Sequence, residues 1–151
     1  MNPHVDVRSP LMEKALGHLG AAVLELELGG VLALAIGNAL LKFAGILAQH
    51  APDAEDLATY RAAVERTPAG DAAEIPYAYL HSQQNRVLSH LGHARRRCVA
   101  DGIPDATLRH ALLAVAGVLI CRAYGTAAAH RAERQYAQGL RIGRHRSPPS
   151  A

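Results

Sequence analysis

Arginine and histidine side chains recur along residues 86–97 at a spacing that brings them together. The four residues are Arg86, His90, His93 and Arg97. They are four, three and four residues apart, which places them along one face of a helix. Arg95 and Arg96 flank that face. The pattern is typical of a solvated outer helix face. The alternative is that these residues form a strip that contacts a protein partner or phosphate groups.

A second group of arginines lies near the C-terminus: Arg141, Arg144 and Arg146, before two prolines. We expect residues 140–151 to form a short, flexible basic tail and residues 1–139 to form the folded domain. Acting together with Arg95, Arg96 and Arg97, the tail would bind nucleic acid mainly through phosphates. Such binding would be weakly sequence-specific and strongly salt-dependent, because no aromatic residues interleave the arginines.

Metal or catalytic chemistry has weaker support. His90 and His93 would need a third ligand from elsewhere to bind a metal, and Cys98 is expected in the core. The sequence lacks a nucleophile elbow, a phosphate-cradling glycine loop and paired catalytic carboxylates at diagnostic spacing. We therefore assign no metal, no cofactor and no catalytic residue. An enzyme that uses His90 or His93 as a base stays open as a third class.

Two short segments resemble functional motifs of helical families. Arg86 and His93, with six residues between them, resemble the ribonuclease motif of HEPN domains, but Val87 follows the arginine where those motifs carry a polar residue. His18 with the two residues after it resembles the phosphorylated helix of histidine phosphotransfer bundles, without the lysine that would steady a phosphoryl group. No catalytic role is transferred from either resemblance.

Composition predicts an all-α fold. Half of the 151 residues are hydrophobic and only 4% are aromatic, and the apolar residues are mainly good helix formers. The length suits one domain. We expect a single compact bundle of about five helices with a short basic C-terminal tail. Cys98 and Cys121 lie in apolar patterns without paired spacing, which favours buried free thiols and a cytoplasmic protein.

Capping signals and apolar periodicity place the elements. Ser9 and Pro10 should begin a helix that ends near Leu28. Further helices are expected over residues 31–50, in a short surface segment after Asp53, over 76–100 and from 105 to about 139. Pro68 and Gly70 mark a loop within the domain.

Two stretches leave alternatives open. Residues 24–36 also resemble a β-hairpin with glycines at the turn, although that register mixes glutamates with apolar residues on one face. Residues 28–48 approach the length of a membrane span, although Asn38 and Lys42 interrupt them. A buried helix is the favoured interpretation of both stretches.

Small residues follow one face of each of the two most apolar stretches. One set is Gly30, Ala33, Gly37, Ala44 and Ala48, and the other is Ala114, Gly117, Cys121, Gly125 and Ala128. Because small residues let helix backbones approach closely, these two helices should pack together at the centre. The favoured function is a non-enzymatic interaction or regulatory protein that binds a protein partner or a second copy. Nucleic-acid binding and membrane association are the alternatives.

Overall fold

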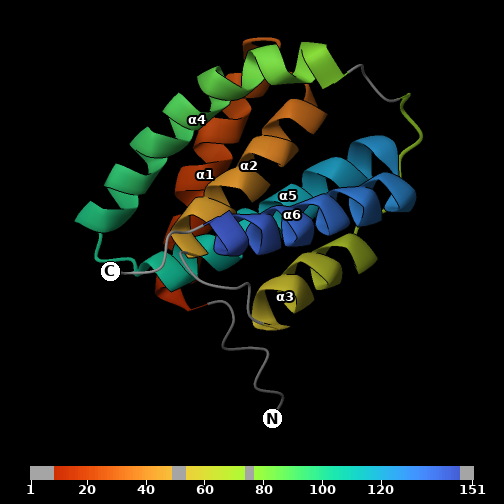
Figure 1. Cartoon of the computed structure of the whole chain (residues 1–151). Helices are drawn as coiled ribbons and strands as arrows, with labels where there is room; N and C mark the ends of the chain where they lie inside the picture. The colour runs from red at the N-terminus through yellow and green to blue at the C-terminus, as the bar shows by residue number, and fades with distance from the viewer. Residues whose placement is uncertain (1–8, 49–53, 74–76, 147–151) are drawn as a thin grey trace.

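Six α-helices make up the part of the chain that the structure describes. The computed structural model describes residues 9–48, 54–73 and 77–146, and no strand occurs in these ranges. The helices are α1 (Pro10–Leu28), α2 (Ala33–Ala48), α3 (Ala54–Glu65), α4 (Tyr77–Ala100), α5 (Asp105–Tyr124) and α6 (Thr126–Arg146). Figure 1 shows α4 alongside α1 and α2, and α5 beside α6. The all-α class is confirmed, and the arrangement is compatible with a single bundle.

The ends of α1 follow the predicted signals. The Ser9 hydroxyl accepts a hydrogen bond from the Met12 amide at 3.2 Å, and Pro10 opens the helix. Gly30 has a φ of +84°, a left-handed conformation that favours glycine, so the chain turns there. The hairpin alternative is wrong. The helix sorts the faces better, because Leu26 is buried while Glu25 and Glu27 are exposed.

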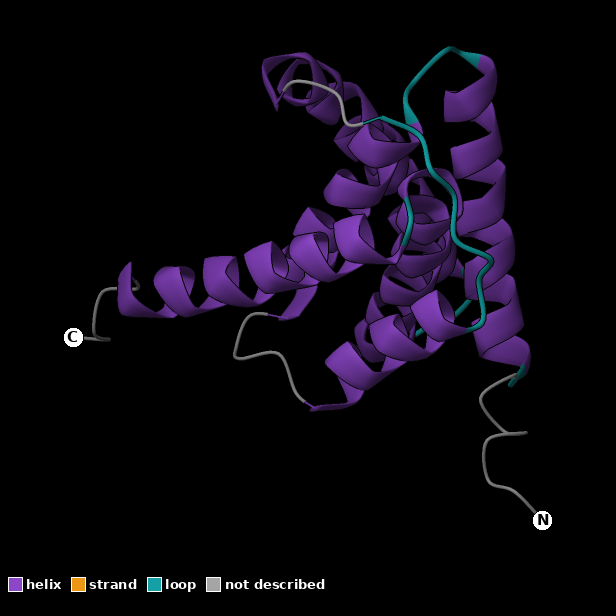
Figure 2. Cartoon of the chain, turned by 90° about the vertical axis from the view of Figure 1, so that its right-hand side faces the viewer, coloured by secondary structure: helices purple, strands orange, loops and turns teal. Residues whose placement is uncertain are grey.

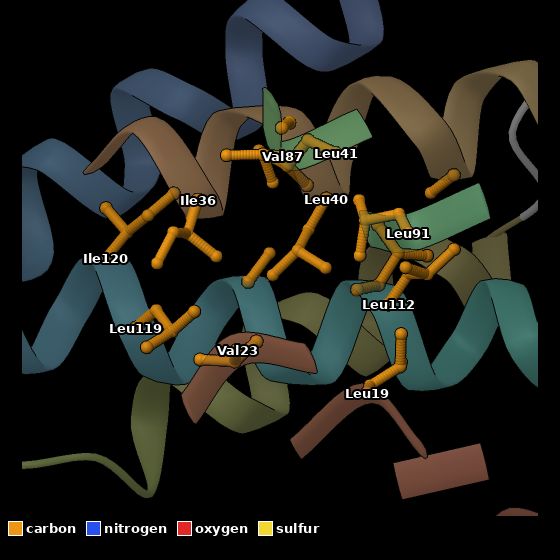
Figure 3. Packing of buried hydrophobic residues seen from close by; sticks show 14 of the residues in the cluster. Leu19, Val23, Ile36, Leu40, Leu41, Val87, Leu91, Leu112, Leu119 and Ile120 are labelled. Carbon is orange, nitrogen blue, oxygen red and sulfur yellow. The ribbon is translucent and has the colours of Figure 1, made fainter. Parts of the chain in front are cut away.

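The core forms around α5, which packs against α1, α2, α3 and α6. Its contact with α2 is the most extensive in the bundle, as the two apolar stretches predicted. Figure 3 shows buried side chains from α1, α2, α4 and α5 converging. At Gly37 a Cβ would stand 2.5 Å from Ile120 Cγ1, so glycine permits the approach. Gly117 faces α3 instead: its Cβ would stand 3.0 Å from the Tyr60 carbonyl.

The helix expected from residue 105 to 139 is two helices, which raises the count among the described residues from about five to six. The break lies at Gly125, whose φ is +94°. The loop after α3 fills the break: the Gly70 amide donates to the Cys121 carbonyl and the Ala72 amide to the Ala123 carbonyl, both at 2.9 Å. The Ala72 bond supplies a partner for a carbonyl in the last turn of α5, and the Gly70 bond adds a second donor to the Cys121 carbonyl, which also accepts from the Gly125 amide.

Helix α6 extends beyond the expected domain boundary. It continues through Gly139 to Arg146, so the backbone of residues 140–146 is helical where a flexible tail was expected. A single glycine inside a helix costs only about 1 kcal/mol, which does not force an end. Figure 2 shows the last turns of α6 projecting away from the other helices. Residues 147–151 lie outside the described part of the chain.

Polar contacts hold α3 to the bundle. The buried Tyr60 hydroxyl donates to the Ala129 carbonyl of α6 at 2.6 Å, and burial raises the pKa of Tyr60. Arg61 donates two hydrogen bonds to Glu133 of α6, at 2.9 and 2.8 Å. On the other side, Asp56 contacts α5. The first turn of this helix was expected at the surface, yet Asp56 is fully buried.

Two further predictions concern buried residues. Cys98 and Cys121 are free and buried, as predicted. By length and composition, one described helix could cross a membrane. It is α5, and half of its 18-residue apolar segment is buried inside the bundle. The central helix of a bundle meets the same criterion. The stretch proposed as a span contains α2, which has 16 residues, whereas a span needs about 20.

A candidate binding cleft between α1 and α4

Helices α1 and α4 lie antiparallel and enclose a polar cleft. At one end, the Arg86 guanidinium lies 2.7 Å from the point where a Cβ on Gly29 would stand. At the other end, His18 bonds Asp101, directly after α4. The open cleft between α1 and α4 has a volume of about 260 Å³. Its lining residues are His18, Ala21, Ala22, Glu25, His90, His93, Ala94 and Arg97.

The structure brings together three of the four residues in the predicted strip. His90, His93 and Arg97 line the cleft. Arg86 instead lies over the C-terminal turn of α1, where a cation interacts favourably with the helix dipole. Of the two arginines in the strip, Arg86 therefore contacts the end of α1, and Arg97 lines the cleft.

The other predicted arginines either lie on a different helix from the cleft or form side-chain hydrogen bonds near it. Arg95 donates to Asp105 at 3.0 Å, and Arg96 donates to His93 at 2.6 Å. Arg141, Arg144 and Arg146 belong to the last turns of α6, which packs on α5, α2 and α3, and their side chains lie outside the described part. The predicted arginines therefore lie on two helices that do not pack extensively on each other.

Hydrogen bonds fix the tautomers of two cleft histidines. His93 Nδ1 accepts from the Arg96 guanidinium, which has no acceptor, so the neutral ring carries its proton on Nε2. His90 Nδ1 donates to the Arg86 carbonyl at 3.1 Å, so its Nε2 is an acceptor when the ring is neutral. The two rings thus offer a donor and an acceptor.

His18 is oriented by a carboxylate. Its Nε2 donates to Asp101 Oδ2 at 2.7 Å, which leaves Nδ1 as the second ring nitrogen. This bond is the largest cause that lowers the pKa of Asp101, and the charges of His18 and Lys14 lower it further. The pair fixes the ring of His18 at the wall of the cleft and links α1 to the turn after α4.

Two opposite charges in the cleft have no partner within the described residues. Arg97 and Glu25 both line the cleft, and neither forms an ion pair in that part of the chain. Both side chains are exposed. The cleft therefore presents to an incoming ligand a cation and a carboxylate that are not paired by any residue the structure describes.

Two exposed leucines lie on α1 outside the lining of the cleft. Leu24 is 57% exposed and Leu28 is 80% exposed. They are four residues apart and share a helix face with Ala21, a cleft residue. Apolar side chains beside a polar cleft are a feature of protein contact surfaces.

The described residues give no metal site. No group of three or more His, Cys, Asp or Glu residues among them could hold a metal ion. Cys98, four residues after Ala94, is buried in the core, and burial raises the pKa of its thiol. A thiol in this environment is inert.

Helical spacing on α4 did not identify Glu25 or Asp101 as residues of the site, and it did not connect His18 with the strip on α4. Helical spacing identifies residues that share a face of one helix, but the neighbour across that face depends on packing. The available signal was on α1: His18, Ala21, Ala22 and Glu25 are spaced three, one and three residues apart, which makes a stripe with polar ends and a small apolar middle.

The His18 bond should be measurable through the titration of Asp101. Because the folded state lowers the pKa of this carboxyl, the pair stabilises the fold when the pH is above 3.8, the ordinary pKa of an aspartate. That contribution is lost as pH falls through the lower folded value. In His18→Ala, we expect the Asp101 carboxyl to titrate at a higher pH in a carbon-detected NMR titration. Lys14→Ala should raise it less. An unchanged Asp101 titration in His18→Ala would contradict this assignment.

Comparison of the chain with protein-family models, with curated proteins and with solved structures gave no match.

Proposed function

We propose that this chain is a helical-bundle interaction protein and that the cleft between α1 and α4 binds a segment of a partner protein. The observation that carries the proposal is that one open hollow gathers His90, His93 and Arg97 with Glu25. Glu25 has no ion-pair partner among the described residues. Unpaired groups of both signs suit the side chains of another protein. They give orientation and specificity more than affinity.

The charges favour a protein over a nucleic acid. Nucleic-acid binding depends on many cations that neutralise phosphates along a backbone. Here the carboxylates of Glu25 and Asp101 lie in or beside the cleft, and Asp105 engages Arg95. Leu24 and Leu28 on α1 are exposed and would gain by burial against a protein. A surface that binds a phosphate backbone would instead carry an excess of cations over carboxylates.

Site-directed photo-crosslinking tests this function. A photoreactive amino acid at Ala21, in the cleft, should crosslink one partner in extracts of the cells that make the protein. The same amino acid at Ala58 is the control, because Ala58 is also exposed but lies on α3, which packs on α5 and α6. Equal products from both positions, or none from Ala21, would overturn the proposal.

Charge reversal separates specific from incidental capture. Arg97→Glu should lower the yield of the Ala21 crosslink by about five-fold, which corresponds to about 1 kcal/mol of lost attraction and added repulsion. Arg66→Glu makes the same charge change at an exposed residue after α3 and should leave the yield unchanged. A product of twice the mass of the chain would show that the cleft joins two copies, which contradicts a separate partner.

A further inference from the structure

The unpaired charges of the cleft also indicate what the bound segment carries. We propose that the partner segment has a basic and an acidic side chain within a few residues, and that these pair with Glu25 and Arg97. The inference rests on the proposed function, since it names the chemistry of the segment that enters the same cleft.

The antiparallel arrangement places the two charges toward opposite ends of the cleft. Arg97 lies four residues before Asp101, which bonds His18. Glu25 lies four residues before Gly29, which adjoins Arg86. Four residues correspond to about 6 Å of helix. The cation is therefore near the His18 end and the carboxylate near the Arg86 end.

The same geometry sets the spacing of the segment. From His18 to Gly29, α1 rises about 16 Å, and from Arg86 to Asp101, α4 rises about 22 Å. Each charge lies about one turn, or about 6 Å, in from its end of the cleft. Subtracting these two turns from the rise of α1 leaves roughly 4 Å between the charges, and subtracting them from the rise of α4 leaves roughly 10 Å. In an extended peptide, side chains two residues apart point the same way and are separated by about 7 Å. A basic and an acidic residue with one residue between them fit this distance.

The remaining lining suits a peptide backbone beside those side chains. Ala21, Ala22 and Ala94 supply small apolar surface. His93 offers an Nε2–H donor, because Arg96 occupies its Nδ1. A phosphorylated or purely acidic ligand would meet Arg97 favourably, but it would also face the free carboxylate of Glu25 without a matching cation. A ligand with both charges leaves neither group unpaired.

Peptide titrations test the inference with the full chain. The probes are Ac-Ala-Lys-Ala-Glu-Ala-amide and the sequence with Lys and Glu exchanged, each with versions in which Gln replaces Lys or Glu. Binding is followed by the amide shifts of the ¹⁵N-labelled protein. We expect at least one peptide with both charges to bind about three- to five-fold more tightly than its singly charged versions, since an exposed pair contributes up to about 1 kcal/mol.

Variants assign each charge to its partner. Glu25→Gln should remove the advantage of Lys, and Arg97→Gln should remove the advantage of Glu, each without the other effect. Glu65→Gln and Arg66→Gln are matched controls at exposed positions outside the cleft. Circular dichroism of each variant checks that the fold is retained.

The outcomes separate this inference from the proposed function. If Ala21 still crosslinks a partner but Glu25→Gln binds the doubly charged peptide as well as the parent chain does, the charge pairing is wrong and the cleft remains a protein contact. The inference is also overturned if the peptide with Gln in place of Lys binds as tightly as the peptide with both charges. It is overturned as well if no peptide shifts the amide signals of the cleft residues. Loss of the Ala21 crosslink itself would remove the proposed function.

Discussion

Asp56→Ala should lower the free energy of unfolding by about 3–5 kcal/mol, because it leaves a buried positive charge without compensation. Asp56 is 0% exposed, and both of its oxygens lie 3.0 Å from Arg109 Nε. The Arg109 side chain is only 16% exposed. His110 Nε2 lies 3.1 Å from Asp56 Oδ1. Without the carboxylate, α3 loses its main polar attachment to α5.

Urea unfolding followed by circular dichroism measures this loss. The matched control is Arg61→Ala, which breaks the link from α3 to Glu133 of α6. The Arg61 side chain is 57% exposed and Glu133 is 13% exposed, whereas Asp56 is fully buried, so Arg61→Ala should cost less than the about 3–5 kcal/mol expected for Asp56→Ala. Asp56→Asn keeps the shape and removes the charge, and it should also destabilise the fold. If Asp56→Ala unfolds within 1 kcal/mol of the parent chain, then Asp56 and Arg109 are not the buried ion pair described here.

Sequence patterns predicted the helix ends that are determined by neighbouring residues in the chain. Ser9 and Pro10 define the start of α1 through one hydroxyl and one missing amide donor, and both can be identified from adjacent residues. The break at Gly125 could not be predicted in this way. It depends on amides of Gly70 and Ala72, more than fifty residues earlier, which bond carbonyls of α5. Without that loop, the apolar pattern continues as one helix.

The candidate site was predicted on one side only. Helical spacing grouped His90, His93 and Arg97, which line the same cleft. It also included Arg86, whose guanidinium lies at the end of α1. The opposite wall comes from α1, about seventy residues earlier in the chain, and Asp101 comes from a turn. Which faces meet is decided by packing around α5, and the sequence of α4 alone does not contain that information.

Burial of polar residues was the other property that the sequence did not reveal. Asp56 in the first turn of a helix is typical of an exposed residue that favours the helix N-terminus. Its burial follows from Arg109 and His110 on α5, which approach it from the partner helix. A buried carboxylate is predictable only when its cations are known to be close. Arg109 and His110 lie more than fifty positions after Asp56 in the chain.

The loop that ends α5 leads to the second large effect: Gly70→Ala should destabilise the fold by about 3 kcal/mol. A Cβ at Gly70 would overlap the Arg122 carbonyl oxygen and would stand 2.7 Å from the Ala123 carbonyl oxygen. Both are backbone atoms of the last turn of α5, so they cannot move aside as a side chain would. Overpacking of this kind costs about 1–3 kcal/mol, and the displaced loop also weakens two backbone hydrogen bonds.

Gly20→Ala is the matched comparison, because the same methyl group enters open space. A Cβ at Gly20 meets nothing within 4 Å, and the residue lies inside α1. Alanine there should raise the free energy of unfolding by about 0.5–1 kcal/mol. The two substitutions should therefore shift the urea midpoint in opposite directions. If Gly70→Ala also raises the midpoint, the loop does not cap α5, and the end of that helix must be satisfied in another way.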